Sequence, residues 1–111
     1  MKREIKFRAR DESGAWRYGS LRHDLGEWFI YENDKHKVEG ETIGQFTGLL
    51  DRKRIEIYEG DIILYQLDSG EKLNLEVKFL DGRFSPFGQG GVYPQDCWVI
   101  GNIYENHELL I

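Results

Sequence analysis

Hydrophobic and polar residues alternate along most of the chain, and the alternation is clearest near its start. In residues 4–10, Ile5, Phe7 and Ala9 alternate with charged side chains. A period of two places successive side chains on opposite faces of a strand, so this segment predicts a half-buried β-strand whose apolar side chains point inward. The side chains predicted to point outward are Lys6, Arg8 and Arg10.

Turn signals separate the predicted strands in the first half of the chain. Residues 11–14 (Asp-Glu-Ser-Gly) return the chain into a strand over 15–18. A second hairpin joins residues 28–31 to 37–39 around Asn33-Asp34, because Asn and Asp tolerate the backbone conformations of tight turns. The first half therefore predicts short strands connected by hairpins.

The second half shows the same pattern with stronger turn chemistry. Strands are predicted over 62–65, 73–79 and 97–104, and Asp81-Gly82 is typical of a type I′ hairpin turn. Residues 68–70 predict a further turn, and residues 84–94 a glycine-rich loop. Two glycines call for special backbone: Gly60 favours a positive φ before a strand, and Gly101 favours a bulge or close packing. The one helical signal is a short terminal turn capped by Asn106.

Together these elements predict a mostly β protein with little helix. The second half contains about five short strands joined by tight turns, which are typical of an SH3-like barrel or roll. We therefore predict one domain over 1–111, with N-terminal strands and hairpins over 1–48 and an SH3-like barrel portion over 49–111 that ends in a short helical turn.

Charge is unevenly distributed along the 111 residues. The net charge is −5, but residues 1–55 carry +2 and residues 56–111 carry −7. An acidic total disfavours a protein whose main role is to coat nucleic acid or anionic membrane. A polyanion would therefore have to contact the first half. One cysteine, a charged start and the lack of a long apolar run predict a cytoplasmic protein with no membrane contact.

Candidate catalytic and metal-binding residues are few. Glu59 and Asp61 lie two apart beside Gly60, a spacing open to paired catalytic carboxylates or to a turn in which Asp61 bonds backbone. No further acid, base or nucleophile is anchored to them, which favours the turn. Isolated histidines predict no metal site. These are His23, His36 and His107.

Two further features have structural explanations. Asp96 beside Cys97 disfavours the thiolate, so Cys97 is predicted to be packed and inert. The run around Gly88, Gly90 and Gly91 lacks the lysine and helix of a phosphate-binding loop, so we predict no cofactor.

One basic and aromatic cluster is a candidate partner-contact surface. Such a mixture can neutralise phosphates and stack on bases, although outward charges on an edge strand also prevent aggregation. The cluster consists of Arg8, Arg10, Trp16, Arg17 and Tyr18.

Three blocks of sequence resemble the YopX family of small phage and prophage proteins. They are residues 3–9 (REIKFRA), the middle segment with 45–49 (QFTGL), Asp51 and 56–62 (EIYEGDI), and the end with 99–106 (VIGNIYEN) and 108–110 (ELL). The resemblance implies an SH3-like barrel in the second half and a phage or prophage origin. It does not imply a mechanism and assigns no catalytic residue.

The sequence departs from the usual pattern of that family at three places. Arg10 stands where tryptophan is common, and His107 stands where proline is usual. Lys53-Arg54 replaces an Asn-Gly-like turn, so this hairpin is predicted to use another turn type.

Function is predicted from the absence of a convergent catalytic set and from a β architecture with exposed edges. The leading hypothesis is a non-catalytic protein-interaction module that binds a host or phage protein. The alternatives are a weak nucleic-acid-binding adaptor that uses the basic N-terminal face, and an enzyme with a site around Glu59 and Asp61. Neither the partner nor the oligomeric state follows from the sequence.

Overall fold

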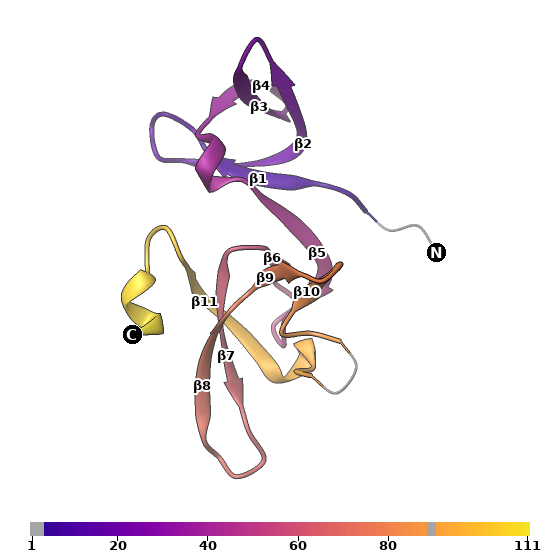
Figure 1. Cartoon of the computed structure of the whole chain (residues 1–111), viewed down its shortest axis with the longest axis vertical. Coiled ribbons are helices and arrows are strands. Elements are labelled where there is room, and N and C mark those ends of the chain that lie inside the picture. The colour runs from indigo at the N-terminus through magenta and orange to yellow at the C-terminus, as the bar shows by residue number, and fades with distance from the viewer. Residues whose placement is uncertain (1–3, 89–90) are drawn as a thin grey trace. The chain divides into compact units, whose positions relative to one another are not determined.

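A computed structural model describes residues 4–88 and 91–111, and it confirms a mostly β protein. Short 3₁₀ turns are the only helical segments in this described part of the chain. The chain forms two compact units, Met1–Phe46 and Thr47–Ile111, and each is described by itself (Figure 1). The boundary between them lies two residues before the division predicted after residue 48.

The first unit is an antiparallel sheet of hairpins. Its strands lie in the order β4-β3-β2-β1-β5, and β5 continues into the second unit, where it pairs with β6. The hairpin predicted around Asn33 is confirmed, because Asn33 has φ +61° between two paired strands. The elements are β1 (Phe7–Arg10), β2 (Trp16–Asp24), β3 (Glu27–Glu32), β4 (Asp34–Val38), the 3₁₀ turn η1 (Gly40–Thr42) and β5 (Gly44–Leu50).

Strand β2 changes partners at Gly19. It pairs with β1 as far as Gly19 and with β3 from Ser20 onward. A Cβ atom at Gly19 would overlap the backbone carbonyl of Tyr31, so the close approach of the strands requires glycine there. Strands β1, β3 and β4 contribute Ala9, Ile30 and Val38 to the small hydrophobic core of this unit.

Two predicted side-chain directions near the start of the chain are wrong. Arg8 was expected to point outward but is only 6% exposed, with its guanidinium carbon 4.8 Å from the ring centroid of Trp16. Ile5 was expected inward but is 67% exposed, because β1 begins only at Phe7. A long arginine side chain can be buried along an aromatic face, which the alternation of residues does not reveal.

The second unit contains a three-stranded antiparallel sheet in the order β11-β7-β8 and a separate hairpin of β9 and β10. Its core consists of Ile57, Ile63, Val77, Phe84, Phe87, Val92 and Cys97. Closure into an SH3-like barrel stays a prediction. The elements are β6 (Glu56–Tyr58), β7 (Asp61–Gln66), β8 (Lys72–Glu76), β9 (Lys78–Leu80), β10 (Arg83–Ser85), η2 (Pro94–Asp96), β11 (Cys97–Asn102) and η3 (His107–Leu110).

The type I′ turn between β9 and β10 is confirmed. Both central residues have positive φ, +52° at Asp81 and +80° at Gly82, and Leu80 pairs with Arg83. Residues 84 and 85 belong to β10, so the predicted loop began too early. The strand extends because Phe84 pairs with Phe79, with ring centroids 5.0 Å apart. Gly90, in the predicted loop, lies outside the described residues.

The special glycines of the second unit are also confirmed. Gly60 has φ +94°, and the pairing of β11 with β7 shifts register between Val99 and Gly101. A Cβ atom at Gly101 would collide with the side chain of Asn106. These positions therefore need glycine for the backbone and the packing of the fold.

The terminal turn exists, but its predicted side-chain cap is wrong. Residues His107–Leu110 form η3 with no capping bond from the Asn106 side chain. Asn106 Oδ1 instead accepts a hydrogen bond from the backbone N of Asn102 at 3.2 Å. The side chain thus stabilises the end of β11 rather than the helix, and β11 ends at Asn102, two residues earlier than expected.

Candidate functional site

Two arginines of the predicted N-terminal contact surface form ion pairs with carboxylates of the first unit. Arg17 Nε donates to Asp11 Oδ2 at 2.9 Å, and Arg17 Nη1 lies 3.5 Å from Glu32 Oε1. Arg10 Nε lies 3.5 Å from Glu39 Oε1. Arg8 and Arg10 both lie over the ring of Trp16, and Tyr18 is exposed. The five residues are therefore neighbours, and the charges of Arg10 and Arg17 already face carboxylates of the same unit.

The ionisation of Asp11 reflects this local network. The Ser13 hydroxyl and the Arg17 guanidinium donate to its carboxylate and hold its pKa well below the usual range. The same contact raises the pKa of Arg17. The network closes the hairpin between β1 and β2 and leaves the carboxylate little basicity for chemistry.

Asp61 has a structural position in the turn before β7. It is 1% exposed, and its Oδ2 accepts the backbone N–H of Tyr58 at 2.7 Å. Glu59 is half-buried in the same turn. The carboxylate of Asp61 is therefore directed at the backbone, as the turn interpretation predicts.

The histidines and the cysteine lie in separate places. His23 stacks on Trp28 with ring centroids 4.3 Å apart, and His36 Nε2 lies 3.1 Å from the carbonyl of Glu32. Within residues 4–88 and 91–111, no three His, Cys, Asp or Glu side chains gather to hold a metal ion. Cys97 is buried, and burial together with the nearby Asp96 raises its pKa to about 12. The predicted packing of Cys97 is thus confirmed, and the raised pKa disfavours the reactive thiolate.

The motif at the end of the chain organises backbone. Asn102 Oδ1 accepts the N–H groups of Tyr104 and Glu105, both at 3.0 Å, and Asn102 Nδ2 donates to Glu105 Oε1 at 2.9 Å. Together with Asp61, this shows that polar residues of the resemblance motifs bond nearby turns. These side chains therefore stabilise the fold and are not directed at a binding surface.

Asp51 organises the hairpin that lacks an Asn-Gly turn. Its Oδ1 accepts the backbone N–H groups of Lys53 at 2.8 Å and Ile55 at 2.9 Å, and its Oδ2 accepts that of Val99 at 2.9 Å. Arg54 has φ +65°, the left-handed conformation that glycine usually supplies. The predicted use of another turn type is confirmed, and the carboxylate also attaches this turn to β11.

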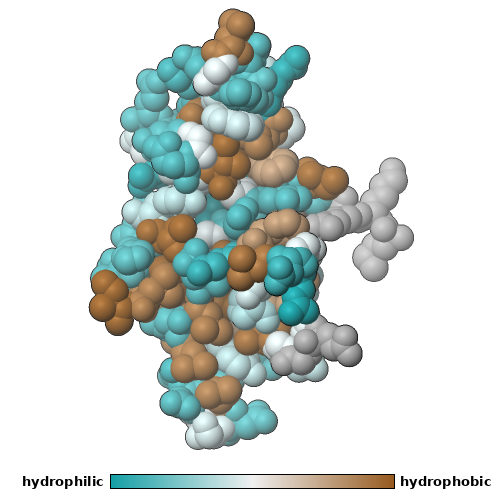
Figure 2. All heavy atoms as spheres, viewed as in Figure 1, coloured by the Kyte–Doolittle hydropathy of each residue, from teal (hydrophilic) through white to brown (hydrophobic). Residues whose placement is uncertain are grey.

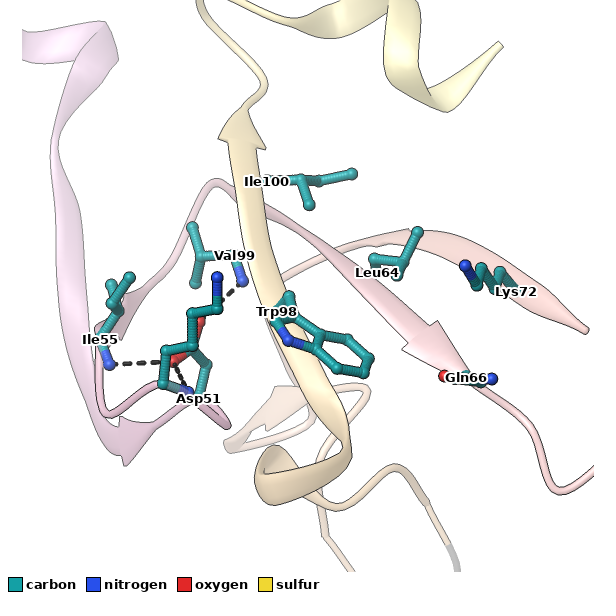
Figure 3. Close-up of a pocket in the computed structure, with 9 residues that line it drawn as sticks. Asp51, Ile55, Leu64, Gln66, Lys72, Trp98, Val99 and Ile100 are labelled. Atoms are coloured by element: carbon teal, nitrogen blue, oxygen red, sulfur yellow. Dashed lines mark hydrogen bonds between the residues drawn. The ribbon is translucent and has the colours of Figure 1, made fainter. Parts of the chain in front are cut away.

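A groove lies beside this turn, on the outer face of the three-stranded sheet (Figure 3). It has a volume of about 450 Å³. Trp98 on β11 pairs directly with Leu64 on β7, so both side chains stand on the same face of the sheet. The lining residues are Asp51, Lys53, Ile55, Leu64, Gln66, Lys72, Trp98, Val99 and Ile100.

The groove combines exposed apolar surface with positive charge. Ile55 is 49% exposed and Ile100 38%, and Figure 2 shows hydrophobic residues reaching the surface among hydrophilic ones. The Arg52 guanidinium carbon lies 5.3 Å from the ring centroid of Trp98. Lys53 and Lys72 are exposed and form no ion pair within the described part of the chain. The groove is therefore locally positive, although the second unit as a whole is acidic, with six basic and eleven acidic residues.

Sequence reasoning missed this groove, although one signal for it was present. The final strand alternates Cys97 and Val99 with Trp98 and Ile100. The first pair packs on the core, so the alternation places a tryptophan on the outer face. The other groove residues come from segments far apart in sequence, and no local pattern joins them.

No helix in the described ranges is long and apolar enough to cross a membrane.

Comparison with known proteins gives a family and a fold. No curated protein matches the chain significantly. The chain is similar to protein EF1440 from Enterococcus faecalis, whose crystal structure superposes with a TM-score of 0.65 at 25% sequence identity. That match covers 99% of this chain and 100% of EF1440. The model of the family described as YopX protein matches residues 3–111, and the chain therefore belongs to the YopX family.

Proposed function

We propose that this chain is a non-catalytic protein-interaction module that binds a segment of a host or phage protein in the Trp98 groove. The observation that carries the proposal is the groove itself, which has an apolar floor around an indole and exposed lysines at its rim. Tryptophan in a partly buried pocket is the type of residue that dominates binding energy at protein interfaces.

A non-catalytic role is supported by how the polar side chains are used. The carboxylates of Asp11, Asp51 and Asp61 each accept hydrogen bonds from turn backbone. The thiol of Cys97 is buried and its pKa is raised to about 12, which disfavours a nucleophile. These three carboxylates and this thiol are thus committed to the fold, which supports the proposal.

The mode of binding follows from the edge of β11. The carbonyl of Cys97 accepts the N–H of Arg52 at 2.9 Å, and the N–H of Val99 donates to Asp51. These bonds occupy backbone groups that a partner strand would need. The partner segment therefore binds through side chains in the groove rather than as an added strand at β11.

The site of action follows from family and redox chemistry. The resemblance of the motifs implies a phage or prophage protein, and the single cysteine of the chain suits a reducing compartment. We place the module in the cytoplasm of a bacterial host.

Comparison of Trp98→Ala with Tyr93→Ala tests the proposal. Tyr93 is an exposed aromatic residue of the same unit and does not line the groove, so it controls for the loss of a ring. In affinity capture from a bacterial lysate, we expect the natural chain and Tyr93→Ala to retain the same partner and Trp98→Ala to lose it. Retention by all three proteins, or no specific partner for the natural chain, would contradict the proposal. Circular dichroism checks that each variant is folded.

A further inference from the structure

We infer that the groove takes an extended acidic segment of a protein, with one large apolar side chain seated against Trp98 and carboxylates on both sides of it. The inference rests on the proposed function and adds the chemistry of the partner. It follows from the floor of the groove, the sign of its charge and the positions of its cations.

The floor selects a large apolar side chain. Trp98 and Leu64 form a direct cross-strand pair, Ile55 extends the apolar surface on the Asp51 side, and Ile100 extends it further along β11. A volume of about 450 Å³ is within the ordinary range of binding pockets. An aromatic or aliphatic side chain would cover the exposed part of the half-buried indole and release water from it.

The charge at the rim selects an acidic segment. Lys53 and Lys72 are exposed and unpaired in the described ranges, and Arg52 lies over the indole. The one carboxylate in the lining, Asp51, is 4% exposed and accepts three backbone N–H groups. An incoming carboxylate would therefore meet cations without competing acids of the groove, whereas a basic segment would meet like charge.

The positions of the two lysines set the spacing of the segment. Lys53 belongs to the turn bonded to β11, and Lys72 lies on β8, which pairs with β7. The Trp98–Leu64 pair lies on the two strands between them (Figure 3). Neighbouring strands lie about 4.8 Å apart, so the three steps from the Asp51 turn across β11 and β7 to β8 span about 14 Å, which about four residues of extended chain cover. The segment thus has an apolar residue flanked within about two residues on each side by Asp or Glu.

A selection from random peptides tests this chemistry directly. The probe is a phage-displayed library of random 12-residue peptides, which is selected against the full chain; each enriched peptide is then tested for binding to Trp98→Ala. Enriched peptides are synthesised with fluorescein, and their Kd is measured by fluorescence anisotropy. We expect an apolar residue flanked by acids, and a Kd that rises several-fold from 50 to 500 mM NaCl because salt screens the ion pairs.

Charge reversal with a matched control completes the test. We expect Lys53→Glu with Lys72→Glu to weaken binding by about tenfold or more, because two attractive contacts become repulsive. The control, Lys78→Glu with Arg83→Glu, makes the same change in net charge at two residues outside the groove and should stay within about twofold. Lys53→Ala with Lys72→Ala gives a smaller loss and serves if the reversal impairs folding.

The outcomes separate the inference from the proposed function. Neutral or basic peptides that require Trp98 would overturn the inference and leave the docking function intact. Peptides that bind independently of Trp98, or no enriched peptide, would contradict both. Tighter binding of a fluorescein-labelled dT20 oligonucleotide, lost on Lys53→Glu with Lys72→Glu, would mean that the groove takes nucleic acid and would also overturn the inference.

Discussion

The turn at Asp11–Ala15 in the first unit and the turn at Asp51–Ile55 in the second have the same hydrogen bonds. In each, the first residue accepts two backbone N–H groups through its Oδ1 and exchanges backbone bonds across the turn. They differ in the second carboxylate oxygen. Asp11 Oδ2 binds the Arg17 side chain of its own hairpin, whereas Asp51 Oδ2 binds the backbone of β11. The Asp11 carboxylate therefore bonds within its own hairpin, whereas the Asp51 carboxylate joins its turn to β11 and lines the groove.

The largest expected difference between the turns is in their replacement by alanine. Asp51→Ala leaves three backbone N–H groups without their acceptor, and we expect a loss of about 3 kcal/mol in the free energy of unfolding. Asp11→Ala should cost less, because it leaves two backbone N–H groups without their acceptor rather than three, and the Arg17 side chain that it releases also reaches Glu32. Urea denaturation of both variants measures the difference. Equal losses would contradict the distinct role of Asp51.

Binding at the groove should follow the same division between the two turns. In Asp51→Ala the turn loses its bond to Val99, so affinity for a groove-binding peptide should fall even where the protein is folded. Asp11→Ala, in the other unit, is the matched control and should bind as the natural chain does.

A smaller effect is expected from the fourth residue of each turn. Gly14 has φ +88° and Arg54 has φ +65°. The left-handed conformation costs a residue with a side chain roughly 1–2 kcal/mol in the folded state. Glycine avoids this strain, but it has more conformational entropy in the unfolded chain, which offsets part of the gain in stability. Arg54→Gly should therefore stabilise the protein by about 0.5–1 kcal/mol, and Gly14→Arg should destabilise it by a similar amount. Thermal melts of both variants check this, and shifts of the same sign would contradict the equivalence of the turns.

The smallest effect concerns acid stability. The pKa of Asp11 is lowered in the folded protein by the Ser13 hydroxyl and by Arg17. The stabilisation is complete above the unfolded pKa of about 3.9 and is lost as pH falls toward the lower folded pKa. We expect the stability of the natural chain to fall more steeply below pH 4 than that of Asp11→Asn. Parallel slopes in urea titrations from pH 5 to 2 would show that the network contributes nothing.

Local turns could be predicted from the sequence, whereas contacts between distant segments could not. Asp81-Gly82 and Gly60 were predictable because their conformations are set by adjacent residues. Burial of Arg8 was not, since it depends on Trp16 of a neighbouring strand. The groove was not predictable either, because its residues come from the Asp51 turn, β7, β8 and β11, and only folding brings them together.

The most direct measurement is an NMR titration of the ¹⁵N-labelled chain with a peptide selected on it. The account predicts chemical-shift changes at the Trp98 indole N–H and the amides of Ile55, Leu64 and Ile100, with the first unit unaffected. Changes centred on Arg17 and Tyr18, with the Trp98 indole unmoved, would contradict it and return the binding surface to the N-terminal strands.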